Sequence, residues 1–299
     1  MKRFLKHIVI LLFVFLGTAT LLSIGSLWSL RNSNFYKPAF LVNGVSEKNF
    51  DYIVLGSSVG LTTLDTKWID SINNTVGINL SMDDTGMSSQ YLMLQHFLAS
   101  GKKTKYCILA PGIAALEYKR ASFGDNDYRF LMFVNRDYVY DYYKNAAPNS
   151  NAAKVSFITK WLPFVGVSYY NTEIFFPSLN SLFQPKKRNR FDENGNYTYP
   201  KSSKAFKSTP SKTEKITFGH PYLKKIKTLC KANNIELIYY FAPMRTERIE
   251  YILPDFPVID HTRVLREDIF FYDDIHVNYM GREKISKLFS QEFDSLKND

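Results

Sequence analysis

The stretch Tyr52-Ile-Val-Leu-Gly-Ser-Ser58 decides the fold class of this 299-residue chain. Its apolar first half is typical of a buried strand, and Gly56-Ser-Ser58 supplies a tight turn directly after it. Segments with helical spacing separate this run from four further apolar runs, at 76–80, 106–110, 235–241 and 258–260. Strands that alternate with helices predict an α/β fold with a parallel sheet and helices on both faces. Functional groups of such sheets gather at the carboxyl ends of the strands, where Ser58 lies.

The N-terminus predicts a membrane anchor. No charged residue occurs from Ile8 to Leu30, and Lys2, Arg3 and Lys6 precede this run. The run is long enough to cross a hydrocarbon core of roughly 30 Å. The positive-inside rule then predicts a cytoplasmic N-terminus and an extracytoplasmic body in the cell membrane. A cleaved secretory signal is the alternative, but the apolar run is longer than the roughly 7–15 residues of a typical signal core.

The chain divides by composition into four parts. We expect a cytoplasmic N-terminus with the transmembrane helix over 1–30, a stalk over 31–49, and an α/β domain over 50–116 and 218–299. Residues 117–217 are rich in Tyr, Phe, Lys and Arg, and they predict a lid-like insertion with turn chemistry at Asn194-Gly195. The aromatic residues fit either core packing of the insertion or a sugar-binding surface.

The net charge of +10 is concentrated in the N-terminus and in residues 186–215, where nine Lys or Arg residues face three acidic ones. With the rest near neutrality and the chain exported, we expect no nucleic-acid partner. The basic stretch fits anionic headgroups, an acidic glycan or a solvated loop. Cys107 and Cys230, the two cysteines, are expected to be buried small hydrophobes rather than a disulfide. No Cys or His spacing suits a metal, and no cofactor is expected.

The second informative segment is Asp273-Asp-Ile-His276, which precedes the last predicted helix. A serine hydroxyl is a weak nucleophile until a base removes its proton, and His276 is the best candidate for that base. Asp273 would orient the imidazole, while His261 is the rival histidine. Each half also has a simple structural explanation, a turn for Ser58 and helix capping for Asp273. Their combination at opposite ends of one α/β pattern predicts a catalytic Ser58–His276–Asp273 triad.

These two segments resemble the first and last blocks of the SGNH/GDSL hydrolase superfamily. Gly56-Ser57-Ser58 is similar to the family's Gly-Asp-Ser, with serine in place of aspartate, and Asp273-x-x-His276 matches the last block. The resemblance covers about 50–115 and 218–297, and it implies a three-layer α/β/α sandwich. It also implies an oxyanion hole, with Ser58 and Gly86 at the matching positions, and we expect a backbone N–H near Gly112 to substitute for the family's asparagine. The sequence departs from the family in the spacing around Gly86 and in Ala110-Pro-Gly-Ile-Ala114, which lacks the usual asparagine.

With its predicted membrane anchor and its Gly-Ser-Ser block, the chain resembles the alginate O-acetylation proteins and the D-alanyl-transfer protein of teichoic acids. That likeness implies an extracytoplasmic acyl-ester hydrolase or O-acyltransferase for a cell-surface or exported polysaccharide. It also implies a multi-pass membrane acyltransferase as partner. The alternative is a non-catalytic anchored glycan-binding or scaffold subunit on a degenerate SGNH fold, which the missing asparagine favours.

Overall fold

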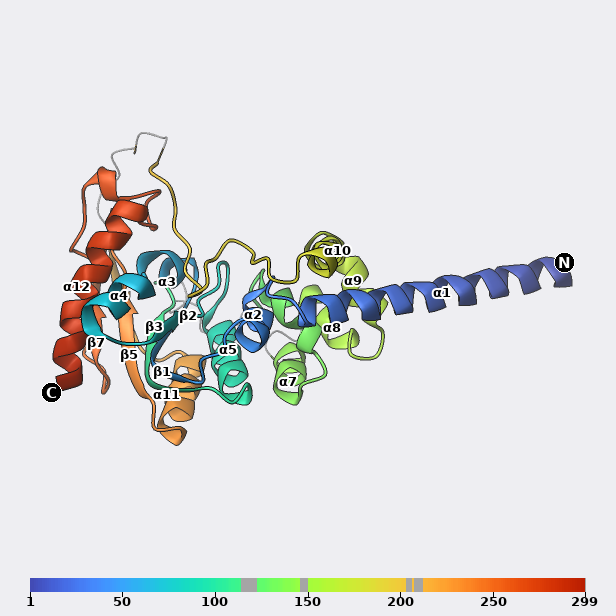
Figure 1. Cartoon of the computed structure of the whole chain (residues 1–299), viewed down its shortest axis with the longest axis horizontal. Helices are drawn as coiled ribbons and strands as arrows, with labels where there is room; N and C mark the ends of the chain where they lie inside the picture. Colours follow the sequence, from blue (N-terminus) through green and yellow to red (C-terminus); the bar gives the residue numbers. More distant parts are fainter. Residues whose placement is uncertain (114–122, 146–149, 203–205, 207–211, 299) are drawn as a thin grey trace. The chain divides into compact units, whose positions relative to one another are not determined.

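The computed structural model describes residues 1–113, 123–145, 150–202, 206 and 212–298. Two compact units emerge from the contacts (Figure 1). The helical unit comprises Met1–Gly44 and Asp127–Asn189, and the sheet unit comprises Val45–Asn126 and Arg190–Asp299.

The sheet unit is built on a five-stranded, wholly parallel sheet, which confirms the predicted α/β class with a parallel sheet. Strand order is β2-β1-β3-β5-β7, with bounds β1 (Asn49–Gly56), β2 (Gly77–Asn79), β3 (Lys103–Ala110), β5 (Glu236–Phe241) and β7 (Val258–Asp260). The chain moves from β1 to one side to form β2 and then returns to the other side for β3. This reversal creates a switch point at the carboxyl ends of β1 and β3.

The central strands are buried on both faces, as the apolar runs predicted. Tyr52 and Val54 of β1 pack in one cluster with Ile285, Phe289 and Phe293 of the last helix. The alternate residues of β1 point to the opposite face, where α5 contacts β1 and α11 contacts β5. The helices of this unit are α3 (Ser58–Thr63), α4 (Thr66–Asn73), α5 (Met87–Ala99), α11 (Pro221–Ala232), η3 (Asp268–Phe270) and α12 (Tyr279–Asn298).

A separate two-stranded parallel sheet joins β4 (Lys212–Ile216) to β6 (Glu247–Tyr251). The apolar pattern did not predict it, because three of the five residues in each strand are charged. Ile216 and Ile249 are nevertheless buried. Cys107 and Cys230 are both buried and unbridged, as expected.

The helical unit contains the long helix α1 (Lys2–Arg31) and a set of short helices. Helices α9 and α10 contact α1. The remaining elements are α2 (Lys37–Asn43), η1 (Asp127–Phe133), α7 (Asp137–Asn145), α8 (Asn151–Ile158), α9 (Pro163–Tyr169), the π-helical turn η2 (Asn171–Phe175) and α10 (Phe176–Phe183).

The division of the chain differs from the predicted ranges in two places. Part of the expected stalk forms α2, in which Phe40 and Leu41 are buried. The expected insertion is split between the two units, because residues 190–202 belong to the sheet unit. Their turn contacts β2: the Asn79 N–H donates to the Asn194 carbonyl, and Gly195 has φ +78°. The turn at Asn194-Gly195 is therefore confirmed, but no strands flank it. Ala114 lies outside the described residues, as do Lys204 and Lys207 of the basic stretch 186–215.

Candidate active site

The turn after β1 places Ser58 at the switch point of the sheet. Ser57 precedes α3, and its hydroxyl accepts a hydrogen bond from the Val59 N–H at 3.4 Å. Ser58 is the first residue of the helix. The turn lies so close to β3 that a Cβ on Gly56 would meet the Ala110 carbonyl oxygen at 2.2 Å, and one on Gly60 would meet it at 2.9 Å. Glycine at both positions is what allows Ser58 to sit over the end of the sheet.

A tight loop before α12 holds Asp273 and His276. The Tyr272 N–H donates to the His276 carbonyl at 2.8 Å, which closes the loop at its base. Inside the loop, one carboxylate oxygen of Asp273 accepts from the N–H groups of Ile275 at 3.0 Å and His276 at 2.8 Å. These two backbone N–H groups thus hold the Asp273 side chain in place independently of its contact with the imidazole.

The structure brings the three predicted residues into one hydrogen-bonded chain. His276 Nε2 lies 2.8 Å from Ser58 Oγ, and His276 Nδ1 lies 2.8 and 2.9 Å from the two carboxylate oxygens of Asp273. A carboxylate only accepts, so it selects the tautomer with hydrogen on Nδ1 and leaves Nε2 free to accept the Ser58 proton. This is the arrangement of a nucleophile, a base and an orienting acid.

The electrostatics of Asp273 favour its charged form. Burial alone would raise the pKa of the Asp273 carboxyl, but hydrogen bonds from the His276 ring and from two backbone N–H groups outweigh it. The net result is a pKa below the ordinary value. Asp273 therefore stays ionised beside the imidazole and stabilises the imidazolium that forms when Nε2 takes a proton.

Arg245 anchors the loop from the segment after β5. Its Nε donates to Asp274 at 2.7 Å, its backbone N–H donates to the Asp274 carbonyl at 3.1 Å, and its guanidinium lies 3.3 Å from Asp268. The Arg245 guanidinium thus binds Asp274, the acidic residue next to Asp273, while Asp273 contacts the imidazole.

Two further residues hold the same loop. Asn278 is buried, donates to the carbonyls of Ile269 and Phe271, and accepts from the first N–H groups of α12. Tyr199 stacks on Tyr272 with ring centroids 4.3 Å apart and an interplanar angle of 5°, and its ring centroid lies 5.3 Å from that of His276. Burial raises the pKa of Tyr199 to about 12, so it remains a neutral wall for the imidazole.

The three predicted oxyanion donors, Ser58, Gly86 and Gly112, line one pocket. Ser58 opens a helix, where the first N–H groups have no intrahelical acceptor. Gly112 follows β3 with φ +82°, and Gly86 precedes α5. A Cβ on Gly112 would lie 3.3 Å from Ser57 Oγ, so the two turns pack directly together. In the described part of the third block, residues 110–113, no asparagine side chain is present.

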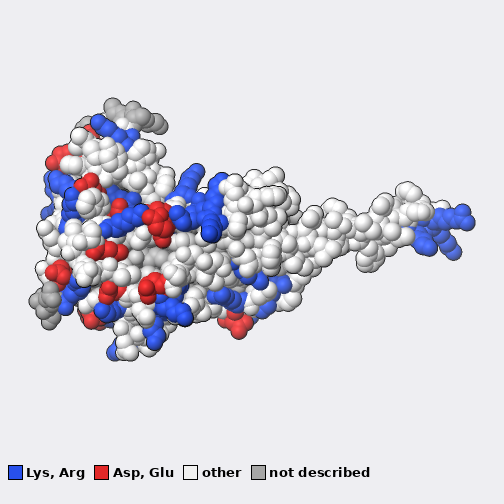
Figure 2. All heavy atoms as spheres, viewed as in Figure 1, with Lys and Arg blue, Asp and Glu red and all other residues white. Residues whose placement is uncertain are grey.

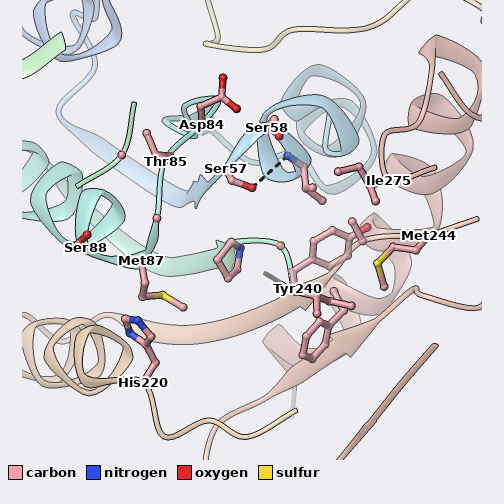
Figure 3. A pocket seen from close by; sticks show the side chains of 18 of the residues that line it. Ser57, Ser58, Asp84, Thr85, Met87, Ser88, His220, Tyr240, Met244 and Ile275 are labelled. Atoms are coloured by element: carbon pink, nitrogen blue, oxygen red, sulfur yellow. Dashed lines mark hydrogen bonds between the residues drawn. The ribbon is translucent and has the colours of Figure 1, made fainter. Parts of the chain in front are cut away.

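The pocket has a volume of about 690 Å³ and opens beside Ser58 (Figure 3). Apolar side chains form much of its wall, among them Met87, Tyr240 and Met244. Polar side chains line the rest, including Asp84, Asp125, His220 and Glu247. An apolar wall combined with polar groups is typical of small-ligand sites.

The rival histidine has a different environment. His261 is buried, with Nδ1 3.2 Å from the Tyr240 hydroxyl and Nε2 3.2 Å from Glu292, and burial lowers its pKa. Its hydrogen-bonding atoms therefore face the core and α12 instead of Ser58. His220 lines the pocket, but its Nδ1 accepts from the Tyr222 N–H at 3.2 Å and caps α11. Among the described residues, no cluster of three or more His, Cys, Asp or Glu side chains is arranged to hold a metal.

Asn79 is a site residue that the sequence reasoning missed. Its buried amide donates to the carbonyls of Gly60 at 3.0 Å and Leu64 at 3.3 Å, and its side-chain oxygen accepts from the Ser81 N–H at 3.0 Å. It therefore connects the end of β2 to α3, the short helix that Ser58 opens, and to the C-cap of that helix. The available signal was an amide residue at the carboxyl end of a short apolar strand, directly beside the strand that leads to Ser58.

Comparison with protein-family models and with curated proteins finds no match for this chain.

Proposed function

We propose that this protein is an extracytoplasmic serine acyl-ester hydrolase or O-acyltransferase that acts through Ser58, His276 and Asp273. One observation carries the proposal: the 2.8 Å contact between His276 Nε2 and Ser58 Oγ, with Asp273 on the other ring nitrogen. Buried or exposed serine–histidine contacts have many origins, but the ordered Asp–His–Ser chain at the rim of a pocket suits nucleophilic catalysis.

The first half-reaction follows from this geometry. Ser58 Oγ attacks the ester carbonyl carbon while His276 Nε2 takes the hydroxyl proton, so a C–O bond forms and the carbonyl oxygen becomes an oxyanion. Backbone N–H groups of Ser58, Gly112 and Gly86 are the proposed donors to that oxyanion. When the tetrahedral intermediate collapses, the ester C–O bond breaks, and the imidazolium returns its proton to the departing alkoxide. An acyl group remains on Ser58.

The second half-reaction decides between the two activities. Water or a sugar hydroxyl enters, gives its proton to His276 and attacks the acyl-enzyme carbonyl. The bond between Ser58 Oγ and the acyl carbon then breaks, and the imidazolium returns the proton to Oγ, which restores Ser58. Both activities use the same residues, so the acceptor alone separates them. The apolar wall from Met87, Tyr240 and Met244 supports a short acyl group as the part of the substrate that enters the pocket.

The wider assignment rests on resemblance and on α1. We infer an SGNH-like three-layer domain, held outside the membrane by α1, that modifies a cell-surface or exported polysaccharide beside a multi-pass membrane acyltransferase. Helix α1 is long and apolar enough to cross a membrane. A fold likeness does not by itself fix the substrate, so the polymer and the acyl group have to be identified by screening candidate substrates.

A non-catalytic glycan-binding subunit is the competing function, and the absence of an asparagine among residues 110–113 favours it. Loss of one oxyanion donor costs roughly 10²–10³ in rate in a working esterase. The two functions therefore differ in whether Ser58 reacts.

The test is covalent labelling of the full-length protein with a fluorophosphonate probe. Wild type should be labelled, and Ser58→Ala and His276→Ala should not. Ser57→Ala is the matched control and should retain labelling, because the Ser57 hydroxyl accepts from the Val59 N–H whereas the Ser58 hydroxyl contacts His276. A folded wild type that fails to react, or a Ser58→Ala variant that still does, would overturn the enzyme in favour of the binding subunit.

Turnover of aryl acetates and acetylated sugars would then be measured with and without a glycan acceptor. Release of free acid indicates hydrolysis, and acylated acceptor indicates transfer.

A further inference from the structure

Helix α10 has its polar and apolar faces reversed relative to a helix of a water-soluble domain. Ser178 and Ser181 are buried, whereas Phe176, Leu179 and Phe183 are exposed. Phe183 alone leaves 85% of its surface uncovered. A surface helix in water buries its apolar stripe and exposes its polar residues, so this helix is built for an apolar surrounding.

The facing part of α1 repeats the same pattern. Ser23, Ser26 and Ser29 recur every three residues and are buried, while Ile24 and Trp28 point outward and are exposed. The Ser29 hydroxyl donates to the Ser178 carbonyl of α10 at 2.7 Å, and α9 and α10 both contact α1. Small residues at the contact and large apolar residues outside are the packing pattern of helices within lipid.

The length of α1 sets the depth of this contact. The apolar run begins at Ile8, directly after the basic residues at the N-terminus, which are seen as a blue cluster at the end of α1 in Figure 2. At about 1.5 Å per residue, Ser23 lies about 22 Å and Ser29 about 31 Å along the axis from Ile8. A hydrocarbon core is roughly 30 Å thick. The packed serines therefore span the outermost ~7 Å of that core, together with the helices that cover them.

Positive charge follows at the level expected for lipid headgroups. Lys186 and Lys187 are exposed and come directly after α10. Their segment is tied to the chain just beyond α1, because the Asn34 N–H donates to the Pro185 carbonyl at 2.7 Å and the Asn189 N–H donates to the Phe35 carbonyl at 2.9 Å. Basic side chains at this level attract anionic headgroups.

We propose that α9 and α10 are embedded in the outer half of the bilayer beside α1, so that the helical unit is a membrane-inserted platform instead of an aqueous insertion. Phe176, Leu179 and Phe183 lie among the acyl chains, and Lys186 and Lys187 contact the headgroups. An immersion of about 7 Å falls within the roughly 5–10 Å typical of interfacial helices. The proposal rests on membrane insertion of α1 and is independent of the chemistry at Ser58.

The test uses the full-length protein in nanodiscs that contain phosphatidylcholine and phosphatidylglycerol. Leu179→Cys and Phe183→Cys are labelled singly with an environment-sensitive fluorophore, in a background with Cys107→Ala and Cys230→Ala. Both labels should emit to the blue, be quenched by lipids brominated on shallow acyl carbons, and show several-fold weaker quenching by aqueous iodide than a control label. The control is Lys144→Cys, at an exposed position on α7 of the same unit.

Labels at 179 and 183 that iodide quenches as strongly as the label at 144 would overturn the proposal, and would assign the face to a protein partner absent from the nanodisc. Thermal unfolding of each variant identifies substitutions that merely disrupt the fold. Because fluorophosphonate labelling of Ser58 is a separate measurement, failure of the platform and failure of the enzyme are distinguishable.

Discussion

Asp273 contacts His276 through both the ring and the backbone, and this double contact separates its structural role from its electrostatic one. Asp273 Oδ1 accepts from the N–H groups of Ile275 and His276 and lies beside the ring Nδ1, while Oδ2 accepts from Nδ1. Its role was predictable, because spacing within the loop places Asp273 and His276 side by side. Asn79 was not predictable, because its partners are carbonyls of α3 and its C-cap, which lie 19 and 15 residues earlier in the chain.

Substitution of Asp273→Asn should leave the loop folded and disable the triad. The amide oxygen can still accept from the two N–H groups, but the negative charge that stabilises the imidazolium is lost. By analogy with serine hydrolases, kcat should fall by up to ~10⁴. Steady-state kinetics with an aryl acetate, alongside thermal unfolding, provides the measurement. A loss of less than ten-fold at unchanged stability would contradict an orienting role for Asp273.

His261 should make the sheet unit sensitive to acid. Burial lowers the pKa of His261 below the ordinary histidine value of about 6.5. Below about pH 6.5 the unfolded chain therefore binds a proton at this residue more readily than the folded chain does. Stability from this group is therefore complete above that pH and declines as pH falls through the window below it. His261→Gln should flatten the dependence of the unfolding free energy on pH in that window. A wild-type profile that matches the variant there would contradict this assignment.

At the scale of the element, the parallel strands were predictable and the supports of the site were not. Continuous apolar runs identify β1, β3 and β5, since strands buried on both faces need such residues. The sheet of β4 and β6 escaped prediction because Lys, Arg and Glu surround the buried Ile216 and Ile249 in the sequence. The contacts of Arg245 with Asp268 and Asp274 were not predictable either, because they join two loops and no local sequence pattern encodes such contacts.

Asn79→Ala should weaken the attachment of α3, the helix that Ser58 opens, to the end of β2. The substitution leaves the carbonyls of Gly60 and Leu64 without this buried donor, and an unsatisfied buried polar group costs ~1–3 kcal/mol. We expect a comparable loss in the free energy of unfolding and a reduced kcat with little change in KM, because Ser58 shifts relative to His276. Denaturant unfolding and kinetics test this.

Asn233→Ala is the matched control for that variant. Its amide donates only to the Leu229 carbonyl at 2.8 Å on an exposed helix end, so stability and kcat should change little. Equal effects of the two substitutions would contradict the role given to Asn79.

At the scale of the molecule, one apolar helix and two compact units organise the chain. The helix was predictable from a charge-free run. The boundaries between the units were not, because residues 190–202 join the sheet unit through backbone contacts with β2, which composition does not reveal. The basic cluster before Ile8 predicts the orientation of the whole chain.

An alkaline phosphatase fused after Asp299 should therefore be active, because that enzyme folds only outside the cytoplasm. The full-length fusion should also stay with the membrane during carbonate extraction, since α1 is expected not to be cleaved. A cytoplasmic reporter fused at the same place should be inactive. The reverse pattern of reporter activity would contradict the predicted orientation.

Ser58 and His276 are 218 residues apart in the chain, which has a consequence for biogenesis. At a synthesis rate of about 5–20 residues per second, the serine is synthesised roughly 10–45 s before its histidine. If export accompanies translation, the hydroxyl has crossed the membrane before its proton acceptor is made. The proposed active site would then never be complete in the cytoplasm, and no separate inhibitor or propeptide would be needed to protect cytoplasmic esters from it.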